Sequence, residues 1–551
     1  PDGRWLSFVA LAPEKATWAI TLPAAPSGAK WTPPPKHIET LHYRQDRAGF
    51  MESGYTHLFV VPADGGTARQ VTRGKWNVGA RFDYLTGGGA HAWSSDGRTI
   101  VVDAFPDTTG DRNYNDSDIL AVDVATGQWR KLTSTRGQWT SPSISPDGRT
   151  VSYVGYETSA RPSYHADELY LVGMDGTNPR KVSGDFDRDV GRRMWSADGR
   201  TLYFTAPDRG TTQVFAASTA GGVRALSSGM HMLALTSLAR NGVGAGVRSD
   251  PTSPADIVRI DLRRGGEAQV SRLTSVNADL LANVKLGTVE ETWYTSSGGA
   301  RVHGWIVKPP NFDASRRYPL IMEIHGGPHG MYNVGFNFMW HNFAANDYVV
   351  LYTNPRGSTG YGSAFGNAIQ RRYPGVDYDD LIAGVDDVVG RGYIDTSRMY
   401  VGGCSGGGVL SSWVIGKTDR FAAAAVRCPV VNWLSMAGQT DVPLFTYNFF
   451  DRPFWEDPAP WLATSPLMLV GNVTTPTLVM TGELDLRTPM AQSEEYYAAL
   501  QMRGVPSALL RFEGEFHGTG SKPSNYMRTQ LYMMSWYERW RRDGQRVERV
   551  E

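Results

Sequence analysis

Short apolar runs alternate with glycine turns through the first half of the chain. The turn sequence Asp-Gly-Arg-Thr starts at Asp96, Asp147 and Asp198, and so returns every 51 residues (147 − 96 and 198 − 147). A run rich in β-branched and aromatic residues follows each copy, as expected where a tight turn joins two strands. The start of the chain, Asp2-Gly3-Arg4 followed by an apolar run, fits the same pattern. This periodicity predicts a repeated unit built from β-hairpins.

A second repeated pattern lies out of phase with the first. It consists of an apolar strand, a glycine turn, a basic residue and a polar end, and its strands start near His57, Asp118, Glu168, Gln213 and Asp256. Four strands in roughly 40–60 residues is the spacing of a propeller blade. We therefore expect a β-propeller over residues 1–280 with its first blade truncated, and keep a β-sandwich as the alternative. The patterns leave the number of blades open.

The pattern changes after about residue 280. Buried-type strands such as 318–324, 399–401 and 477–480 now alternate with periodic helical stretches such as 378–389. Alternation of strands with helices predicts a mostly parallel sheet that is covered on both faces. The predicted domains are therefore a propeller over residues 1–280 and an α/β domain over residues 281–551.

Composition narrows the functional classes. The 551 residues include 55 basic and 55 acidic side chains, so the chain offers neither the basic surface that nucleic acid requires nor a polybasic contact for acidic lipid. Its apolar runs stay far below the roughly 20 residues that span a bilayer. We expect no nucleic-acid partner and no membrane partner, whereas the oligomeric state, including a homo-oligomer, stays open.

The two cysteines, Cys404 and Cys428, are too few for a disulfide framework or a structural zinc site. This usage favours a cytoplasmic location. The chain starts inside a repeat, so we expect a missing N-terminal segment, and a periplasmic or secreted location stays open. The Asp- and Asn-rich segment 107–118 faintly resembles a calcium loop but lacks the glycine and the closing glutamate of that motif. We expect Asx turns there, and no metal.

The segment Gly403-Cys404-Ser405-Gly406-Gly407 matches the nucleophile-elbow pattern Gly-x-Ser-x-Gly. The apolar strand 399–401 precedes it and the buried-type helix 409–415 follows it, which is the context that the motif requires. The alternative is a plain glycine-rich turn. We interpret Ser405 as a catalytic nucleophile.

In a sheet of this kind the acid and the base follow the nucleophile along the chain. His517 is the one histidine after Ser405, among 11 in the chain, and we predict that it is the base. Asp485 follows the apolar strand 477–480, at a strand end where functional groups gather, and we predict that it is the acid. Its rivals in the same stretch are Asp419, Asp441, Asp451, Asp457 and Glu483.

Acyl transfer also requires N–H donors for the developing oxyanion. We expect one from the backbone of Gly406. The segment His325-Gly326-Gly327-Pro328 follows a buried-type strand and should supply the second from Gly327, because glycine leaves its N–H uncovered. A simple turn is the alternative. His325 itself is expected to be structural, since His517 has the role of base.

Together these motifs resemble the prolyl oligopeptidase family. The likeness lies in the His-Gly-Gly-Pro segment, the serine elbow, the terminal His-Gly, Tyr378-Asp379-Asp380 and the run Asn354-Pro355-Arg356-Gly357-Ser358-Thr359-Gly360-Tyr361-Gly362. Two of these forms, the His-Gly-Gly-Pro segment and the run from Asn354, are most similar to the acylaminoacyl-peptidase branch. The resemblance covers the whole C-terminal domain and implies an α/β-hydrolase fold, preceded by a seven-bladed propeller that covers the active site and excludes folded proteins. Gly406 departs from the pattern, because many members carry a bulkier residue after the serine.

The same resemblance implies two substrate-binding residues. Arg487 matches an arginine that in relatives binds a substrate backbone carbonyl, and Trp433 lies where relatives place an aromatic wall of the pocket for the residue before the cleaved bond. The alternatives are an ordinary surface arginine and a core tryptophan. The aromatic side chains between Phe445 and Trp455 either complete this pocket or pack beneath it.

The sequence thus predicts a serine peptidase, without metal or organic cofactor, that hydrolyses short peptides through an acyl-enzyme formed on Ser405. Acylaminoacyl-peptidase or oligopeptidase activity is the first interpretation. A dipeptidyl-peptidase-type exopeptidase, a carboxylesterase and a non-catalytic propeller binding protein are the alternatives. The cleavage specificity stays open.

Overall fold

The computed structural model describes residues 3–15, 18, 20–79, 81–82, 85–86, 90–112, 116–158, 163–263 and 265–542. The chain divides into two compact units, Pro1–Ser159 with Leu171–Pro179, and Ala160–Tyr170 with Arg180–Glu551. Among the described helices, none combines the length and the apolar character that crossing a bilayer requires.

The first unit is built from antiparallel strands. β1 (Trp5–Pro13) pairs with β4 (Gly54–Pro62), which pairs with β5 (Arg69–Gln70). A second sheet has the strand order β12-β11-β10-β6 with β9 also paired to β10, and β13 pairs with β14. The other bounds are β2 (Arg44–Gln45), β3 (Gly49–Phe50), β6 (Asn77–Val78), β7 (Arg81–Phe82), β8 (Leu85–Thr86), β9 (His91–Trp93), β10 (Thr99–Phe105), β11 (Asp118–Asp123), β12 (Trp129–Lys131), β13 (Gly137–Ile144) and β14 (Thr150–Glu157).

The Asp-Gly-Arg-Thr repeat forms the same hydrogen-bonded turn three times. In the first copy, Ser94 Oγ donates to Asp96 Oδ1 (2.6 Å), and that oxygen also accepts the backbone N–H of Arg98 (3.0 Å). The turns at Asp147 and Asp198 repeat both bonds at nearly the same distances. The sequence repeat therefore forms the turns of the hairpins β9–β10 and β13–β14. In the second unit it forms the turn between β17 (Arg193–Trp195) and β18 (Thr201–Asp208).

The polar residue at the end of the second repeated pattern is hydrogen-bonded to the backbone of a neighbouring strand. Thr72 Oγ1 accepts the backbone N–H of Leu58, at 2.9 Å, inside the buried interior of the first unit. Among the described residues the same hydroxyl-to-strand bond recurs at the buried Thr133, Ser183 and Ser227 and, in an exposed setting, at Thr274. Since an unpaired buried N–H costs roughly 1–3 kcal/mol, these hydroxyls stabilise strands where the ladder ends.

The second unit starts with another sheet of mainly antiparallel strands. Its order is β17-β18-β19-β21-β22-β23-β24, with β20 paired to β19, and the contact of β19 with β21 is parallel. No sheet closes on itself among the described strands, and the number of blades stays a prediction. Outside this sheet lie β15 (Glu168–Gly173), which is divided between the two units, and β16 (Arg180–Lys181). The strands of the sheet are β17 (Arg193–Trp195), β18 (Thr201–Asp208), β19 (Thr211–Ser218), β20 (Val223–Ala225), β21 (Met232–Leu238), β22 (Val243–Asp250), β23 (Ser253–Asp261) and β24 (Gln269–Arg272).

An eight-stranded sheet follows from β25 (Thr288–Thr295) onward, in the order β25-β26-β28-β27-β29-β30-β31-β32. The pairs β25–β26 and β26–β28 are antiparallel, and all later pairs are parallel. This is the mostly parallel sheet that the alternation of strands and helices predicts. The remaining bounds are β26 (Arg301–Lys308), β27 (Tyr318–Ile324), β28 (Val349–Asn354), β29 (Ile394–Ser405), β30 (Ala423–Pro429), β31 (Thr477–Gly482) and β32 (Ser507–Phe512).

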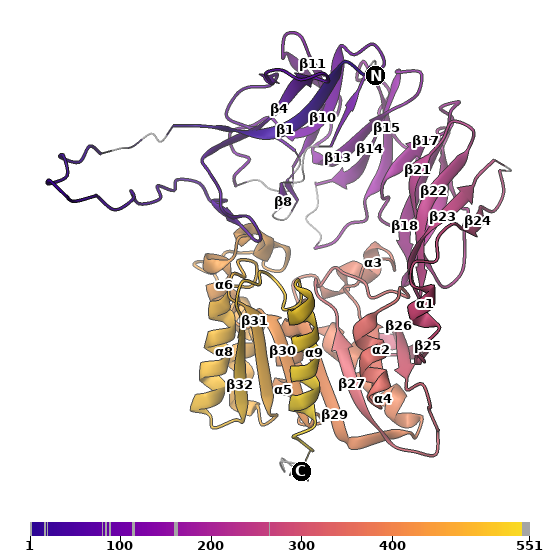
Figure 1. The fold of residues 1–551 in the computed structure, drawn as a ribbon, viewed down its shortest axis with the longest axis vertical. Helices are drawn as coiled ribbons and strands as arrows, with labels where there is room; N and C mark the ends of the chain where they lie inside the picture. The colour runs from indigo at the N-terminus through magenta and orange to yellow at the C-terminus, as the bar shows by residue number, and fades with distance from the viewer. Residues whose placement is uncertain are drawn as a thin grey trace. The chain divides into compact units, whose positions relative to one another are not determined.

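Helices cover both faces of this sheet (Figure 1). Leu320 and Met322 of β27 pack in one buried cluster with α4, α5 and α8, whereas Ile321 packs in the other with α2 and α9. Burial on both faces explains why these strands are apolar without alternation. The bounds are α1 (Ala278–Leu281), α2 (Phe338–Ala345), α3 (Ser363–Gly366), α4 (Val376–Gly390), α5 (Gly406–Lys417), α6 (Trp433–Gln439), α7 (Ala459–Ala463), α8 (Met490–Met502) and α9 (Pro523–Tyr537).

The tight turn between β18 and β19 contacts the C-terminal sheet within the second unit. Arg209 and Gly210 both have positive φ, 48° and 76°, as a two-residue hairpin turn requires. Arg209 N donates to Gly360 O (3.0 Å), and Val334 N donates to Gly210 O (2.9 Å). A Cβ on Gly210 would lie 2.1 Å from the ring of Trp305, so this contact depends on a bare glycine.

We therefore expect Gly210→Ala to destabilise the protein more than Gly222→Ala. Both glycines have positive φ, but a Cβ on Gly222 meets no atom within 4 Å. The clash with Trp305 should add about 1–3 kcal/mol of destabilisation, the usual cost of overpacking. Denaturant unfolding of the two variants measures the difference, and equal unfolding midpoints would contradict the contact.

Candidate active site

Ser405 occupies a sharp turn between β29 and α5. Its φ of +62° and ψ of −119° are unusual for a residue with a side chain. Two glycines make room for the turn, since a Cβ on Gly403 would lie 2.6 Å, and one on Gly407 2.1 Å, from the carbonyl oxygen of Ile324. The strand, turn and helix that the elbow motif requires are all present, with Ser405 half-buried at the turn.

The backbones of Gly406 and Gly327 lie side by side next to Ser405. A Cβ on Gly406 would be 2.8 Å from the nitrogen of Gly327 and 2.9 Å from Oη of Tyr373. Tyr373 also donates a hydrogen bond to the carbonyl of Gly406 (3.1 Å). The departure from the family pattern at Gly406 thus has a steric reason, because Tyr373 and the Gly327 backbone fill the space that a side chain would need.

Asp485 and His517 are hydrogen-bonded to each other past the ends of β31 and β32. Oδ2 of Asp485 lies 2.9 Å from Nδ1 of His517, and its Oδ1 accepts the backbone N–H groups of Arg487 (2.9 Å) and Thr488 (2.8 Å). The carboxylate is buried, whereas the imidazole is partly exposed. The hydrogen bonds fix the carboxylate, and it in turn orients the imidazole.

Thr488 links this pair to the strand beside the serine. Its Oγ1 donates to the carbonyl of Cys428 (2.9 Å) and lies 3.1 Å from Asp485 Oδ2 and 3.2 Å from His517 Nδ1. Cys428 ends a disulfide with Cys404, the residue before Ser405, with Cα atoms 5.2 Å apart. The two cysteines, too few for a framework, thus form a single bridge that connects the serine turn to the acid–histidine pair.

The side chain of Arg487 is paired with Asp441, and not with the carboxylate of Asp485. Its Nε and Nη2 donate to the two oxygens of Asp441, at 2.8 and 3.1 Å, and the Asp441 side chain is fully buried. Asp441, a rival for the role of acid, is therefore the partner of Arg487, and Asp485 is the carboxylate at His517. A bidentate pair of this kind holds the guanidinium in one orientation.

Trp433 is almost fully buried at the start of α6. Its ring contacts those of Tyr373, Phe449 and Phe450, with centroids 6.1, 5.6 and 5.8 Å away, and its indole N–H donates to the carbonyl of Thr464. Phe449 therefore belongs to the aromatic cluster around Trp433, whereas Trp455 is exposed.

The two histidines of the His-Gly-Gly-Pro region are hydrogen-bonded, His325 in a buried position and His329 in a half-buried one. His325 contacts the carbonyl of Gly326 (2.8 Å) and the hydroxyl of Ser358 (2.9 Å), and burial lowers its pKa. His329 donates from Nδ1 to the carbonyl of Gly357, and burial lowers the pKa of His329 to about 4. These hydrogen bonds hold both imidazoles in place, which agrees with the structural role expected for His325.

An acidic pair that the sequence analysis missed lies near His329. The ring of Tyr164 is 5.4 Å from that of His329, and its hydroxyl donates to Oδ2 of Asp189 (2.8 Å). Oδ1 of Asp189 accepts the backbone N–H of Asp167 (3.1 Å). Burial, and then the negative charge of Asp189, raise the pKa of Asp167 to about 7, against the effect of Arg193. No local motif marks these residues, because the fold alone brings them together.

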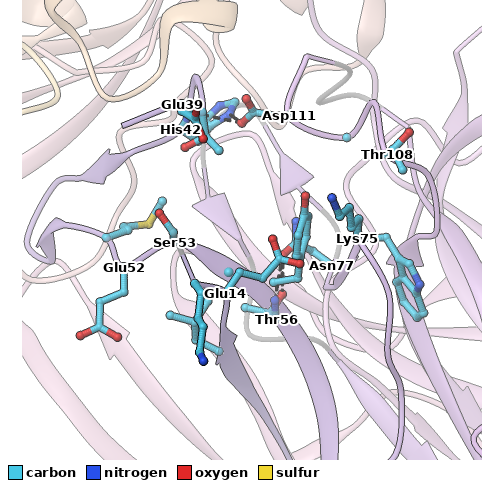
Figure 2. A pocket seen from close by; sticks show the side chains of 18 of the residues that line it. Glu14, Glu39, His42, Glu52, Ser53, Thr56, Lys75, Asn77, Thr108 and Asp111 are labelled. Atoms are coloured by element: carbon cyan, nitrogen blue, oxygen red, sulfur yellow. Dashed lines mark hydrogen bonds and ion pairs between the residues drawn. The ribbon is translucent and has the colours of Figure 1, made fainter. Parts of the chain in front are cut away.

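A cavity of about 560 Å³ lies in the first unit (Figure 2). His42 Nδ1 and Asp111 Oδ1 are 3.0 Å apart in it, and Asp111 Oδ2 accepts the backbone N–H of Leu41 (2.6 Å). Burial raises the pKa of Asp111, but the hydrogen bonds from His42 and the backbone outweigh it and hold that pKa below its usual range. This pair ties the long connection between β1 and β4 to the segment 107–118.

The acidic segment 107–118 is described except for residues 113–115. Asp107 Oδ1 accepts the backbone N–H of Thr109 (2.7 Å), which is the expected Asx turn. Asp116 pairs with Arg136. The described carboxylates of this segment thus have protein partners, Asp118 among them through Lys131.

Comparison with known proteins assigns the family of this site. Residues 334–543, which include Ser405, Asp485 and His517, match the model of the prolyl oligopeptidase family. The chain carries a prolyl oligopeptidase family domain. The Bacillus subtilis peptidase YuxL is 28% identical, with 92% of this chain and 89% of that protein covered. Dipeptidyl-peptidase 5 of Porphyromonas gingivalis is 28% identical over 82% of this chain, which spans 66% of the length of that relative.

Solved structures share the fold. The acylaminoacyl peptidase of Pyrococcus horikoshii has a TM-score of 0.80 and 22% identity, with 100% of this chain and 82% of that chain covered. A puromycin-hydrolysing peptidase of Mycobacterium tuberculosis has a TM-score of 0.63 and 21% identity, over 88% of this chain and 90% of that one. The prolyl oligopeptidase family domain and the peptidase relatives make this chain a serine-type peptidase.

Thr488 should matter for peptidase activity because its hydroxyl holds the acid–histidine pair against the Cys428 carbonyl. Thr488→Val keeps the shape and removes the hydroxyl, and we expect kcat to fall about tenfold, the worth of one hydrogen bond, with KM little changed. Thr488→Ser keeps the hydroxyl and should retain most of the activity. A chromogenic peptide assay measures both variants, and equal loss in the two would contradict this role.

Proposed function

We propose that this protein is a serine peptidase of short peptides that acts through Ser405, His517 and Asp485. Ser405 attacks the scissile carbonyl, His517 takes and returns the proton, and Asp485 orients the imidazole and stabilises its charged form. The observation that carries the proposal is the 2.9 Å contact of the buried Asp485 carboxylate with the partly exposed His517 imidazole. Thr488 and the disulfide link this pair to the residue before the serine.

The neighbouring backbone supports the rest of the mechanism. The N–H groups of Gly406 and Gly327 would stabilise the tetrahedral oxyanion, since the two residues pack against each other beside Ser405. Arg487, held by Asp441, would bind a substrate carbonyl. Trp433 would back the pocket for the residue before the cleaved bond. This mechanism calls for neither a metal nor an organic cofactor.

Acylaminoacyl-peptidase or oligopeptidase activity is the first form of the proposal. The shared fold with acylaminoacyl peptidases supports it. We further propose that the N-terminal sheets are the blades of a seven-bladed propeller, over residues 1–280, that limits substrates by size. The α/β-hydrolase domain would then cover residues 281–551.

Dipeptidyl-peptidase activity is the second candidate, and one specific observation favours it. Asp167 and Asp189 form an acidic pair that could hold the charged amine of a free peptide end, beside the Tyr164 and His329 rings. Several curated relatives are named dipeptidyl-peptidase 5. A dipeptidyl peptidase needs an acidic group two substrate residues away from the nucleophile, where it can bind the free amine. An enzyme that acts on N-blocked substrates needs no such group.

Removal of the Ser405 hydroxyl should abolish turnover. We expect Ser405→Ala to lower kcat on a peptide anilide by at least about 10³-fold, because the covalent route is lost. Ser411→Ala is the matched control: its buried hydroxyl also lies on α5, where it donates to the Gly408 carbonyl, and it should keep near-normal kcat. Ser405→Ala protein with undiminished turnover would refute the mechanism.

The two candidate activities differ in how they use the acidic pair. If the enzyme is a dipeptidyl peptidase, Asp167→Asn should raise KM for a free-amine dipeptide anilide about tenfold or more, and leave an N-acetylated amino-acid anilide unaffected. The wild-type KM for the free dipeptide should also fall as the pH rises through about 7, because Asp167 ionises there. The exposed Asp185→Asn serves as control. Preference for the acetylated substrate, with no effect of Asp167→Asn, identifies an acylaminoacyl peptidase, and turnover of esters alone identifies a carboxylesterase.

A further inference from the structure

The disulfide sulfur of Cys428 lies against the acid–histidine pair. The sulfur of Cys428, a carboxylate oxygen of Asp485 and a ring nitrogen of His517 all lie within 4.8 Å of one another. Cys428 and Asp485 are buried, and His517 is half-buried. A sulfur, an imidazole nitrogen and a carboxylate oxygen are the three kinds of atom that bind zinc in proteins.

In the oxidised protein this set is incomplete as a metal site. A disulfide sulfur carries no thiolate charge, and the thiolate is the form of cysteine that ligates metals. Reduction changes this, because it releases the Cys428 sulfur from Cys404 and lets it move. Tetrahedral zinc ligands lie roughly 3.5 Å apart. The three ligand atoms already lie within 4.8 Å of one another, so a small movement of the freed sulfur is enough to close the set.

We infer that reduction of the Cys404–Cys428 disulfide creates a zinc-binding site, formed by Cys428, Asp485 and His517, that switches the peptidase off. In the reducing step a dithiol is oxidised to its own disulfide, and its two electrons and two protons pass to Cys404 and Cys428, which become thiols. Zinc then displaces the thiol proton of Cys428 and takes a lone pair of His517. A fourth position stays open to water, as in sites with three protein ligands.

Zinc binding and loss of activity are separate consequences. The metal would bind whatever the role of Ser405, since its ligands are on β30 and in the loops after β31 and β32. The loss of activity rests on the proposed function, because it follows only if His517 is the base that accepts the proton of Ser405. Cys404 is half-buried and not fully enclosed, which gives a reductant a route to the disulfide.

Two variants separate the thiol from the disulfide. Cys404→Ser leaves Cys428 as a thiol without any reductant, and the double variant Cys404→Ser/Cys428→Ser has neither thiol nor disulfide. Zn²⁺ is titrated into each variant and into the oxidised wild-type protein in competition with a chromophoric chelator. We expect one zinc ion per Cys404→Ser chain. Loss of an outer-shell partner already weakens metal binding roughly 10–100-fold, so the double variant and the oxidised protein should bind at least about 100-fold more weakly.

Activity is then measured at the same zinc concentrations. Each protein is compared with its own rate of peptide hydrolysis without zinc. Cys404→Ser should lose that rate as zinc binds and regain it with a chelator, whereas zinc should not change the rates of the double variant and of the oxidised protein. If Cys404→Ser fails to fold, wild-type protein reduced with a trialkylphosphine, and freed of it under argon, replaces it. Equal zinc affinity with and without the Cys428 thiol, or no binding by the thiol form, overturns the proposed site. Binding without loss of activity overturns the switch. If the proposed triad is wrong, Ser405→Ala keeps full peptide hydrolysis. This result has no bearing on the zinc titration, so the two failures can be told apart.

Discussion

The positive φ of Ser405 is the constraint on which the site depends. A residue with a side chain stays in this conformation only where its surroundings enforce it. Here Gly403 and Gly407 allow the turn to pack against the carbonyl of Ile324, and Gly406 allows it to pack against Gly327. The turn thus places the Gly406 backbone against the backbone of Gly327. The start of α5 and the loop after β27 therefore hold Ser405 in this conformation.

A second set of contacts brings the acid and the histidine to this turn. Parallel pairing of β29 with β30 places Cys404 close to Cys428, and the disulfide joins them. The Cys428 carbonyl then holds Thr488, which touches both Asp485 and His517. One residue earlier on β30, Arg427 pairs with Glu323 of β27 in the buried core and adds a further tie between these strands. The carboxyl ends of four neighbouring strands thus meet at one place, as in other open α/β sheets.

Local patterns in the sequence account for much of this arrangement. The Asp-Gly-Arg-Thr repeat predicts the hairpin turns because the hydrogen bonds of its Asp and of the preceding Ser stay within four residues. The elbow motif is equally local, because its glycines leave the space that the turn at Ser405 requires. Contacts between distant residues were not predictable in this way. Asp441 looks like any acidic residue until the fold brings it to Arg487, 46 residues later. The disulfide was not predicted because a separation of 24 residues in the sequence does not reveal that the two strands are paired. The contact of Tyr373 with Gly406 was not predicted because no motif marks Tyr373.

Covalent labelling tests the central claim, that Ser405 is the nucleophile, most directly. The protein is treated with a fluorophosphonate, its intact mass is measured, and the labelled peptide is sequenced by mass spectrometry while hydrolysis of a peptide anilide is followed in parallel. The account predicts one label per chain, attached to Ser405, with activity lost in proportion to labelling. A label on another residue, or full peptide hydrolysis after Ser405 is completely modified, would contradict it.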